Sequence, residues 1–67
     1  MRNRLKELRA RHGLNQTELA KLAKISRQTV SQIERVEYIP SLIIAARIAK
    51  IFNESIEDIF IFEEGDY

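Results

Sequence analysis

The sequence contains no cysteine and no tryptophan, one proline and two glycines among its 67 residues. The lack of cysteine excludes disulfide bonds and thiolate metal sites, and the single histidine, His12, leaves a zinc site almost without ligands. The longest apolar run, residues 42–46, is far too short to span a membrane, and the charged N-terminus lacks the apolar stretch of a signal peptide. These absences predict a cytoplasmic protein without a metal or other cofactor.

The length allows one domain. A domain of this size buries only about 60% of the surface of its unfolded chain, so its own core gives limited stability. Because disulfides and metals are excluded, association with a partner subunit is the remaining form of reinforcement. A second copy of the chain is therefore an expected partner.

The net charge of +1 conceals an uneven distribution along the chain. Residues 1–35 hold nine Lys and Arg against three Asp and Glu, a balance of +6, whereas residues 36–67 hold two against seven, a balance of −5. A basic half beside an acidic half indicates that one side faces a polyanion. Chance segregation of charge in a small helical protein is the alternative that charge alone leaves open.

Start and stop signals predict five helices with short loops, an all-α domain. The first is expected at about residues 2–12, where Leu5 and Leu8 share one face and Gly13 supplies the left-handed residue that ends a helix. The other four follow residues that can cap a helix, namely Asn15, Ser26, Ser41 and Ser55. Residues 61–67 are half apolar and half acidic, which leaves a short strand and a disordered tail as alternatives.

The segment from Gln16 to Arg35 combines a helix, a tight turn and a second helix. Its apolar residues fall where two steeply crossing helices touch: Leu19, Ala23, Ile25, Val30 and Ile33. The second helix presents Arg, Gln, Thr and Ser outward, and such side chains form hydrogen bonds with base edges in the major groove. Helix N-termini add free backbone N–H groups that can bind phosphate.

These residues resemble a known family. The stretches LRARHGLNQTELAKLAKISRQTVSQIE, YIPSL and IAKIFNESIEDIF are similar to phage repressor and Cro-type helix-turn-helix regulators, the XRE family. The resemblance implies a five-helix, lambda-repressor-like domain in residues 1–60, with the helix-turn-helix at 16–35 and a C-terminal tail at 61–67. It also implies a homodimeric transcriptional regulator, expected to be a repressor, that binds a palindromic operator in double-stranded DNA.

The resemblance assigns roles to single residues. Base reading falls to Arg27, Gln28 and Gln32 on the recognition helix. Contacts to DNA phosphates or thymine methyl groups fall to Gln16, Thr17, Thr29, Arg35 and Ser41. Arg9 and Glu34 are expected to form a buried ion pair that joins the first helix to the end of the recognition helix.

Two positions depart from the family pattern. Lys24 stands in the turn where glycine is common, and a positive φ there costs about 1 kcal/mol. Residues 35–37 read Arg-Val-Glu where Asn-Gly-Lys is frequent, so Glu37 would face a phosphate that it repels. This charge argues against phosphate contacts from the loop.

The C-terminal half has more apolar residues than a lone small domain should need. In the fourth helix, Leu42, Ala45, Ala49 and Phe52 are expected to face the core, and Ile44, Ile48 and Ile51 form a second stripe. The predicted dimer interface is the run Ile59, Phe60, Ile61 and Phe62. Alternatively, Ile59 and Phe60 close the core of one subunit and residues 61–67 fray. A two-fold dimer would place two recognition helices about one DNA turn apart, roughly 34 Å.

A second function class remains open at this point, namely an antitoxin-type interaction module in which DNA binding is secondary. A toxin gene beside the gene for this chain would favour that alternative. An enzyme is not expected, because the chain offers no nucleophile–base set, phosphate loop or metal-ligand spacing, and five short helices leave little pocket volume. Neither a small-molecule ligand nor a membrane partner is expected.

Overall fold

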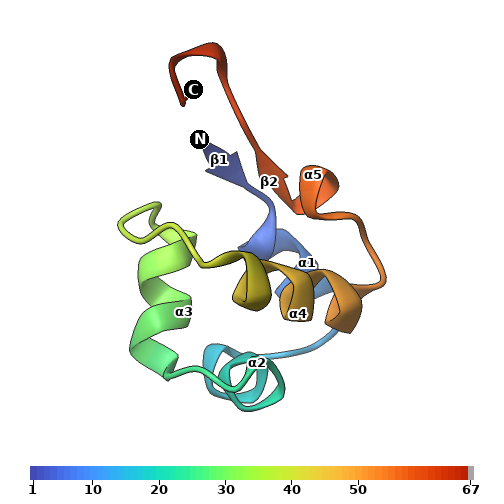
Figure 1. The fold of residues 1–67 in the computed structure, drawn as a ribbon. Coiled ribbons are helices and arrows are strands. Elements are labelled where there is room, and N and C mark those ends of the chain that lie inside the picture. The colour runs from blue at the N-terminus through green and yellow to red at the C-terminus, as the bar shows by residue number, and fades with distance from the viewer. Residues whose placement is uncertain (67) are drawn as a thin grey trace.

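The structure is a computed structural model that describes residues 1–66. Its five α-helices are α1 (Leu5–Arg11), α2 (Gln16–Ala23), α3 (Arg27–Glu34), α4 (Leu42–Phe52) and α5 (Ile56–Ile59). Two short strands, β1 (Arg2–Asn3) and β2 (Phe60–Ile61), and a 3-10 turn, η1 (Glu64–Asp66), accompany them (Figure 1). The prediction of five helices is confirmed, and the small sheet is an addition to it.

Local hydrogen bonds set the starts of α2, α3, α4 and α5. Each of the predicted cap residues accepts a hydrogen bond from the backbone N–H three positions along: Asn15, Ser26, Ser41 and Ser55. At α2 the capping box is complete, since Glu18 N–H donates to Asn15 Oδ1 at 2.7 Å and Asn15 N–H donates to Glu18 Oε1 at 2.9 Å. These helices therefore begin where short-range sequence signals predict.

Residues with positive φ follow the ends of α1 to α4. They are Gly13 (φ 69°), Lys24 (59°), Val36 (59°) and Asn53 (54°). Glycine adopts this conformation without strain and asparagine at little cost. The strained turn predicted at Lys24 is confirmed. Val36 is an addition to the prediction, and as a β-branched residue it is the least suited of the four to the left-handed region.

The N-terminus differs from the prediction. α1 begins at Leu5 rather than near residue 2, because Arg2 and Asn3 are extended and pair antiparallel with residues 60–61 in the register Arg2 to Ile61. Arg4 N–H continues this link by donating to the carbonyl of Ile59 at 2.9 Å. The backbone groups at the start of the chain thus serve a sheet that holds the two ends of the domain together.

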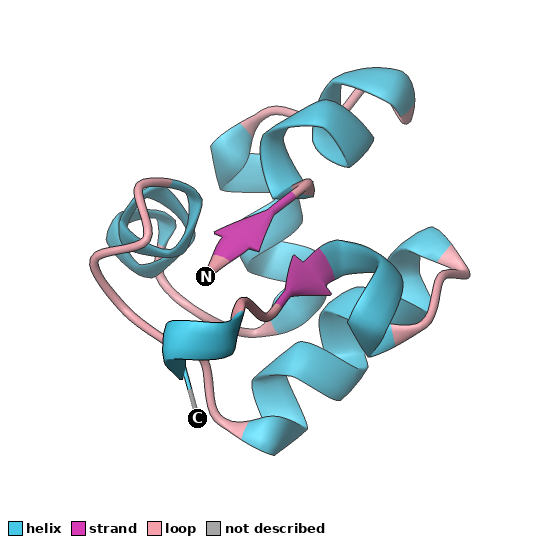
Figure 2. Ribbon diagram, turned by 90° about the horizontal axis from the view of Figure 1, so that it is seen from above, coloured by secondary structure: helices cyan, strands magenta, loops and turns pink. Residues whose placement is uncertain are grey.

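For the tail, the strand alternative holds at its first residue, Ile61, which belongs to β2. The following turn η1 is tied to the start of the chain, since the α-amino group of Met1 lies 2.9 Å from a carboxylate oxygen of Asp66. Figure 2, seen from above, shows the two strands side by side. Tyr67, the last residue of the predicted tail, lies outside the described residues.

One hydrophobic core draws on all five helices and β2. Its buried members are Leu5, Leu8, Leu19, Ala20, Ala23, Val30, Ile33, Ala45, Ile48, Ala49, Phe52, Ile59 and Phe60. The expected orientation of α4 was partly wrong: Leu42 is 76% exposed, whereas Ile48 of the second stripe is completely buried. Ile44 and Ile51 are half-buried against the same core. Among the described helices, none combines the length and the apolarity needed to cross a membrane.

Candidate nucleic-acid interface

The arrangement of α2 and α3 places one face of α3 at the surface. Figure 1 shows α2 nearly end-on while α3 runs roughly vertically in the plane of the view, so the two helices cross steeply. The turn between them is closed by Ile25 N–H, which donates to the carbonyl of Ala20 at 3.0 Å. Because Val30 and Ile33 point into the core, the opposite face of α3 is left to polar residues.

The three expected base-reading residues lie on this outer part of α3. Arg27 and Gln28 are exposed, and Gln32 is half-buried one turn further along. Thr29 is half-buried and belongs to the start of the helix, where its hydroxyl is 2.8 Å from that of Ser26 and its backbone N–H donates to the same oxygen. The face thus offers amide and guanidinium groups, which can form paired hydrogen bonds with bases.

Arg9 and Glu34 form the expected ion pair. Arg9 Nε donates to Glu34 Oε2 at 2.8 Å and Arg9 Nη2 to Oε1 at 3.3 Å, and the two side chains are only 15% and 8% exposed. Arg9 Nη1 also donates to the carbonyl of Leu14, and Gln16 Nε2 donates to Glu34 Oε1 at 3.1 Å. This cluster joins α1, the start of α2 and the end of α3, and so fixes Gln16 relative to the recognition helix.

An open polar depression lies beside this cluster at the N-terminus of α2. It is lined by Arg9, Asn15, Gln16, Thr17 and Arg27. The Arg27 guanidinium and the positive end of α2 favour an anion at this place, whereas the charge of Arg9 is already balanced by Glu34. The depression brings together the predicted contact residues Gln16 and Thr17 with Arg27, which sequence reasoning placed among the base readers alone.

The other two expected contact residues are engaged within the chain. Arg35 Nε and Nη2 donate to the Glu37 carboxylate at 3.0 and 3.1 Å, and Arg35 Nη1 donates to the hydroxyl of Ser31. The hydrogen bond from the Arg35 guanidinium lowers the pKa of the Glu37 carboxyl. Ser41 caps α4, its hydroxyl accepting from Ile44 N–H at 3.3 Å. Sequence reasoning saw Glu37 as a charge that repels phosphate and missed that it pairs with Arg35.

The expected dimer interface needs correction. Ile59 and Phe60 are 0% and 2% exposed within the single chain, so they have no surface to offer a second copy. Both residues instead pack in the core of the single chain, where α5 and β2 meet the rest of the domain. This was the alternative expectation for these two residues. Ile61 is half-buried and Phe62 is partly exposed.

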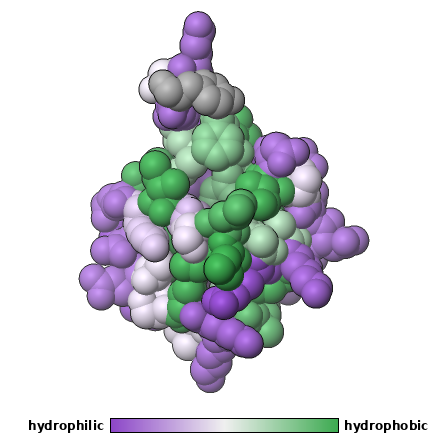
Figure 3. Space-filling model, in the orientation of Figure 1, coloured by the Kyte–Doolittle hydropathy of each residue, from purple (hydrophilic) through white to green (hydrophobic). Residues whose placement is uncertain are grey.

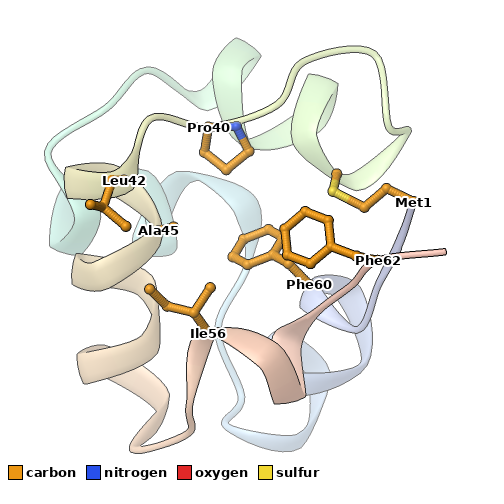
Figure 4. Close-up of a pocket in the computed structure, with 7 residues that line it drawn as sticks. All are labelled: Met1, Pro40, Leu42, Ala45, Ile56, Phe60 and Phe62. Atoms are coloured by element: carbon orange, nitrogen blue, oxygen red, sulfur yellow. The ribbon is translucent and has the colours of Figure 1, made fainter. Parts of the chain in front are cut away.

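Exposed apolar residues gather instead at the N-terminus of α4. Leu42 and Ile43 are 76% and 65% exposed, and Ile39 in the preceding loop is similarly exposed. Beside them lies an apolar pocket of about 220 Å³ lined by Met1, Pro40, Leu42, Ala45, Ile56, Phe60 and Phe62 (Figure 4). Figure 3 shows hydrophobic surface in the middle of the face on which α4 lies, with hydrophilic residues at its sides.

Comparison with known proteins relates this geometry to a wider group. The family model described as Helix-turn-helix matches residues 5–59. An uncharacterized HTH-type transcriptional regulator from Methanocaldococcus jannaschii is 52% identical over 66 residues, covering 98% of this chain and 100% of that protein. The uncharacterized HTH-type transcriptional regulator YgzD from Bacillus subtilis is 47% identical over 64 residues, covering 96% and 97% of the two chains.

A solved structure is similar as well. The crystal structure of the restriction-modification controller protein C.AhdI from Aeromonas hydrophila matches with a TM-score of 0.77 and 33% identity over 85% of this chain and 86% of that one. These matches span most of each chain, so the likeness includes the flanking helices as well as α2 and α3. The resemblance and the fold predicted from the sequence are confirmed.

Proposed function

The chain belongs to the helix-turn-helix family of transcriptional regulators, and from this premise we propose that it represses transcription by binding a palindromic operator as a homodimer. The observation that carries the proposal is the outer face of α3, where Arg27, Gln28 and Gln32 lie beside the polar depression at the start of α2. Base-reading groups and an anion site are thus adjacent on one surface.

On this surface α3 enters the major groove and α2 abuts the DNA backbone. Gln28 and Gln32 can each offer an amide donor and acceptor to adenine N7 and N6, the pairing that suits glutamine. Gln16, held by Glu34, and Thr17 bind a phosphate at the positive end of α2. The phosphate contacts position the domain, and the contacts from α3 select the sequence.

The patch at the N-terminus of α4 is the proposed dimer interface, with a second copy of the chain as its occupant. Leu42 and Ile43 are exposed, and Leu42 also lines the apolar pocket. Across a two-fold axis this exposed apolar patch of each copy can pack against the same patch of the other, which is the self-complementarity that an isologous contact requires. Phe62 lines the pocket, so the predicted interface keeps one of its original members.

Selection of bound duplexes from a random library tests the proposal. The wild-type chain should enrich an inverted repeat whose half-sites are centred about 10–10.5 base pairs apart, or a multiple of this spacing. A Gln28→Ala, Gln32→Ala double variant should lose the enrichment while retaining weak binding to all sequences. Enrichment of a single unpaired half-site would contradict the dimer, and the absence of any enriched sequence would contradict the function.

A promoter carrying the selected site should lose reporter output when the protein is expressed, and increased output would contradict repression.

A further inference from the structure

The chain reverses sharply where α3 ends. Val36 N–H donates to the carbonyl of Ile33 at 2.9 Å and Glu37 N–H to that of Gln32 at 2.8 Å, the pair of bonds that defines a Schellman motif. The motif requires a left-handed residue, and here that residue is Val36 with a φ of 59°. The turn at Val36 brings Glu37 back toward Arg35, the residue that precedes Val36.

Three hydrogen bonds to two groups then hold the Arg35 side chain. The Glu37 carboxylate accepts two hydrogen bonds, from Nε and Nη2, and the Ser31 hydroxyl accepts one from Nη1. A guanidinium group has five N–H donors, so two remain for a ligand. The Arg35 and Glu37 side chains are each 56% exposed, so those donors are accessible to DNA.

Arg35 also lies on the same side of α3 as the expected base readers. It follows Ser31 by four residues and Gln28 by seven, spacings that place residues on one helical face. The buried residues Val30 and Ile33 occupy the opposite side. Arg35 therefore lies at the C-terminal end of the side of α3 that carries the expected base readers.

We propose that Arg35 reads a guanine at one edge of each half-site, with Glu37 and Ser31 as the positioning residues that hold it. This rests on the proposed DNA-binding function and assigns Arg35 a different partner from the phosphate expected by resemblance. Glu37 neutralises the guanidinium charge and would repel a phosphate at the same spot. Guanine O6 and N7 are uncharged acceptors, and their paired contact with arginine is the most frequent specific contact in the major groove.

The experiment uses the full chain and the operator selected with wild type. Arg35→Ala should lower affinity for that operator about 10–100-fold and remove the preference at one guanine per half-site, leaving the other positions unchanged. Arg35→Lys keeps the positive charge but lacks the planar guanidinium that can donate two parallel hydrogen bonds, so it should fail to restore the preference for guanine. Replacing that guanine by 7-deazaguanine should weaken the wild type several-fold and leave Arg35→Ala unaffected.

Glu37→Gln separates positioning from charge. Once the carboxylate charge is removed, Arg35 is free to turn to the backbone, so binding to unrelated DNA should tighten while the guanine preference weakens. Ser31→Ala is the neutral companion variant and should weaken the preference without tightening general binding. Circular dichroism melting curves confirm that each variant is folded.

Two results would overturn the inference. One is a loss of affinity in Arg35→Ala that is equal for all sequences, which would make Arg35 a phosphate contact. The other is an operator preference in Glu37→Gln identical to that of the wild type. Failure of the proposed function looks different, because the wild type itself would then enrich no sequence.

Discussion

At the scale of single residues, the Arg9–Glu34 pair shows how one buried contact links three helices. Glu34 accepts from both Arg9 and Gln16, and its side chain is 8% exposed. Arg9→Met should lower the free energy of unfolding by about 3 kcal/mol, because it leaves a largely buried carboxylate without its cation. Urea unfolding measures this change. Glu34→Gln, which removes the charge but keeps an acceptor, is the milder control, and an unchanged midpoint for Arg9→Met would disprove the argument.

The left-handed residues provide a graded prediction. Val36→Gly should stabilise the domain by roughly 0.5–1 kcal/mol, since relief of a β-branched residue at positive φ outweighs the added flexibility of the unfolded chain. Lys24→Gly should be neutral or slightly stabilising. Asn53→Gly is the matched control and should change little, because asparagine already tolerates this region. Thermal melts rank the three variants, and a Val36→Gly variant less stable than wild type would reverse the conclusion.

The sequence predicted the conformation of single residues correctly where that conformation depends on nearby residues in the chain. The caps were predictable because each depends on a few neighbours in the chain, and the positive φ at Lys24 was predictable from the glycine that is common there in the family. The positive φ at Val36 was not predicted, although the family glycine of Asn-Gly-Lys falls on this position and valine itself gives no signal for a left-handed turn. Glu37 was recognised as an unusual charge, but its pairing with Arg35 follows from that turn.

At the scale of elements, α2 and α3 should differ in what their substitutions do. Gln28→Ala should cost about 1–3 kcal/mol on the preferred operator and relax discrimination at one base pair, expected to be A·T. Gln16→Ala should weaken binding to all sequences alike, since Gln16 lines the polar depression at the start of α2 where we propose that a phosphate binds. Competition binding with operator and unrelated duplex distinguishes the two. Identical behaviour of the variants would remove the division between base and phosphate contacts.

Element boundaries and faces were less predictable. Two-residue strands are too short for an alternating pattern, so β1 was read as the start of a helix whose true first turn begins at Leu5. In α4, apolar residues occupy nearly every side, and periodicity alone cannot choose which side faces inward. Packing makes that choice: Ile48 turns into the core and Leu42 turns out. The predicted interface was wrong for a different reason, because Ile59 and Phe60 are buried in the core of the single chain.

At the scale of the whole molecule, the separation of charge predicts a strong salt effect. Lys21, Lys24 and Arg27 lie on α2, its C-cap and α3, and we expect four to six phosphates to be neutralised per subunit. The logarithm of the association constant should then fall with the logarithm of salt concentration at about 0.9 per phosphate. Fluorescence anisotropy between low and physiological salt measures the slope. A flat response with equal binding to all duplexes would rule out this mode of recognition.

The proposed dimer depends on a small apolar contact. Each large apolar side chain contributes about 1.5–3 kcal/mol when fully buried, so Leu42 and Ile43 from two subunits supply roughly 6–12 kcal/mol. Association itself costs about 4–15 kcal/mol, so these four side chains decide whether a dimer forms. The double variant Leu42→Glu, Ile43→Glu should therefore be monomeric in sedimentation equilibrium at concentrations where the wild type is dimeric.

The same double variant should bind the full operator with no higher affinity than a single half-site, because its two DNA-binding domains are no longer joined in one dimer. Its circular dichroism should match the wild type, since both side chains are largely exposed in the single chain. Leu22→Glu is the matched control: Leu22 is also an exposed apolar residue, but it lies on α2 and should leave the dimer intact. A double variant that remains fully dimeric would place the interface away from α4 and its pocket.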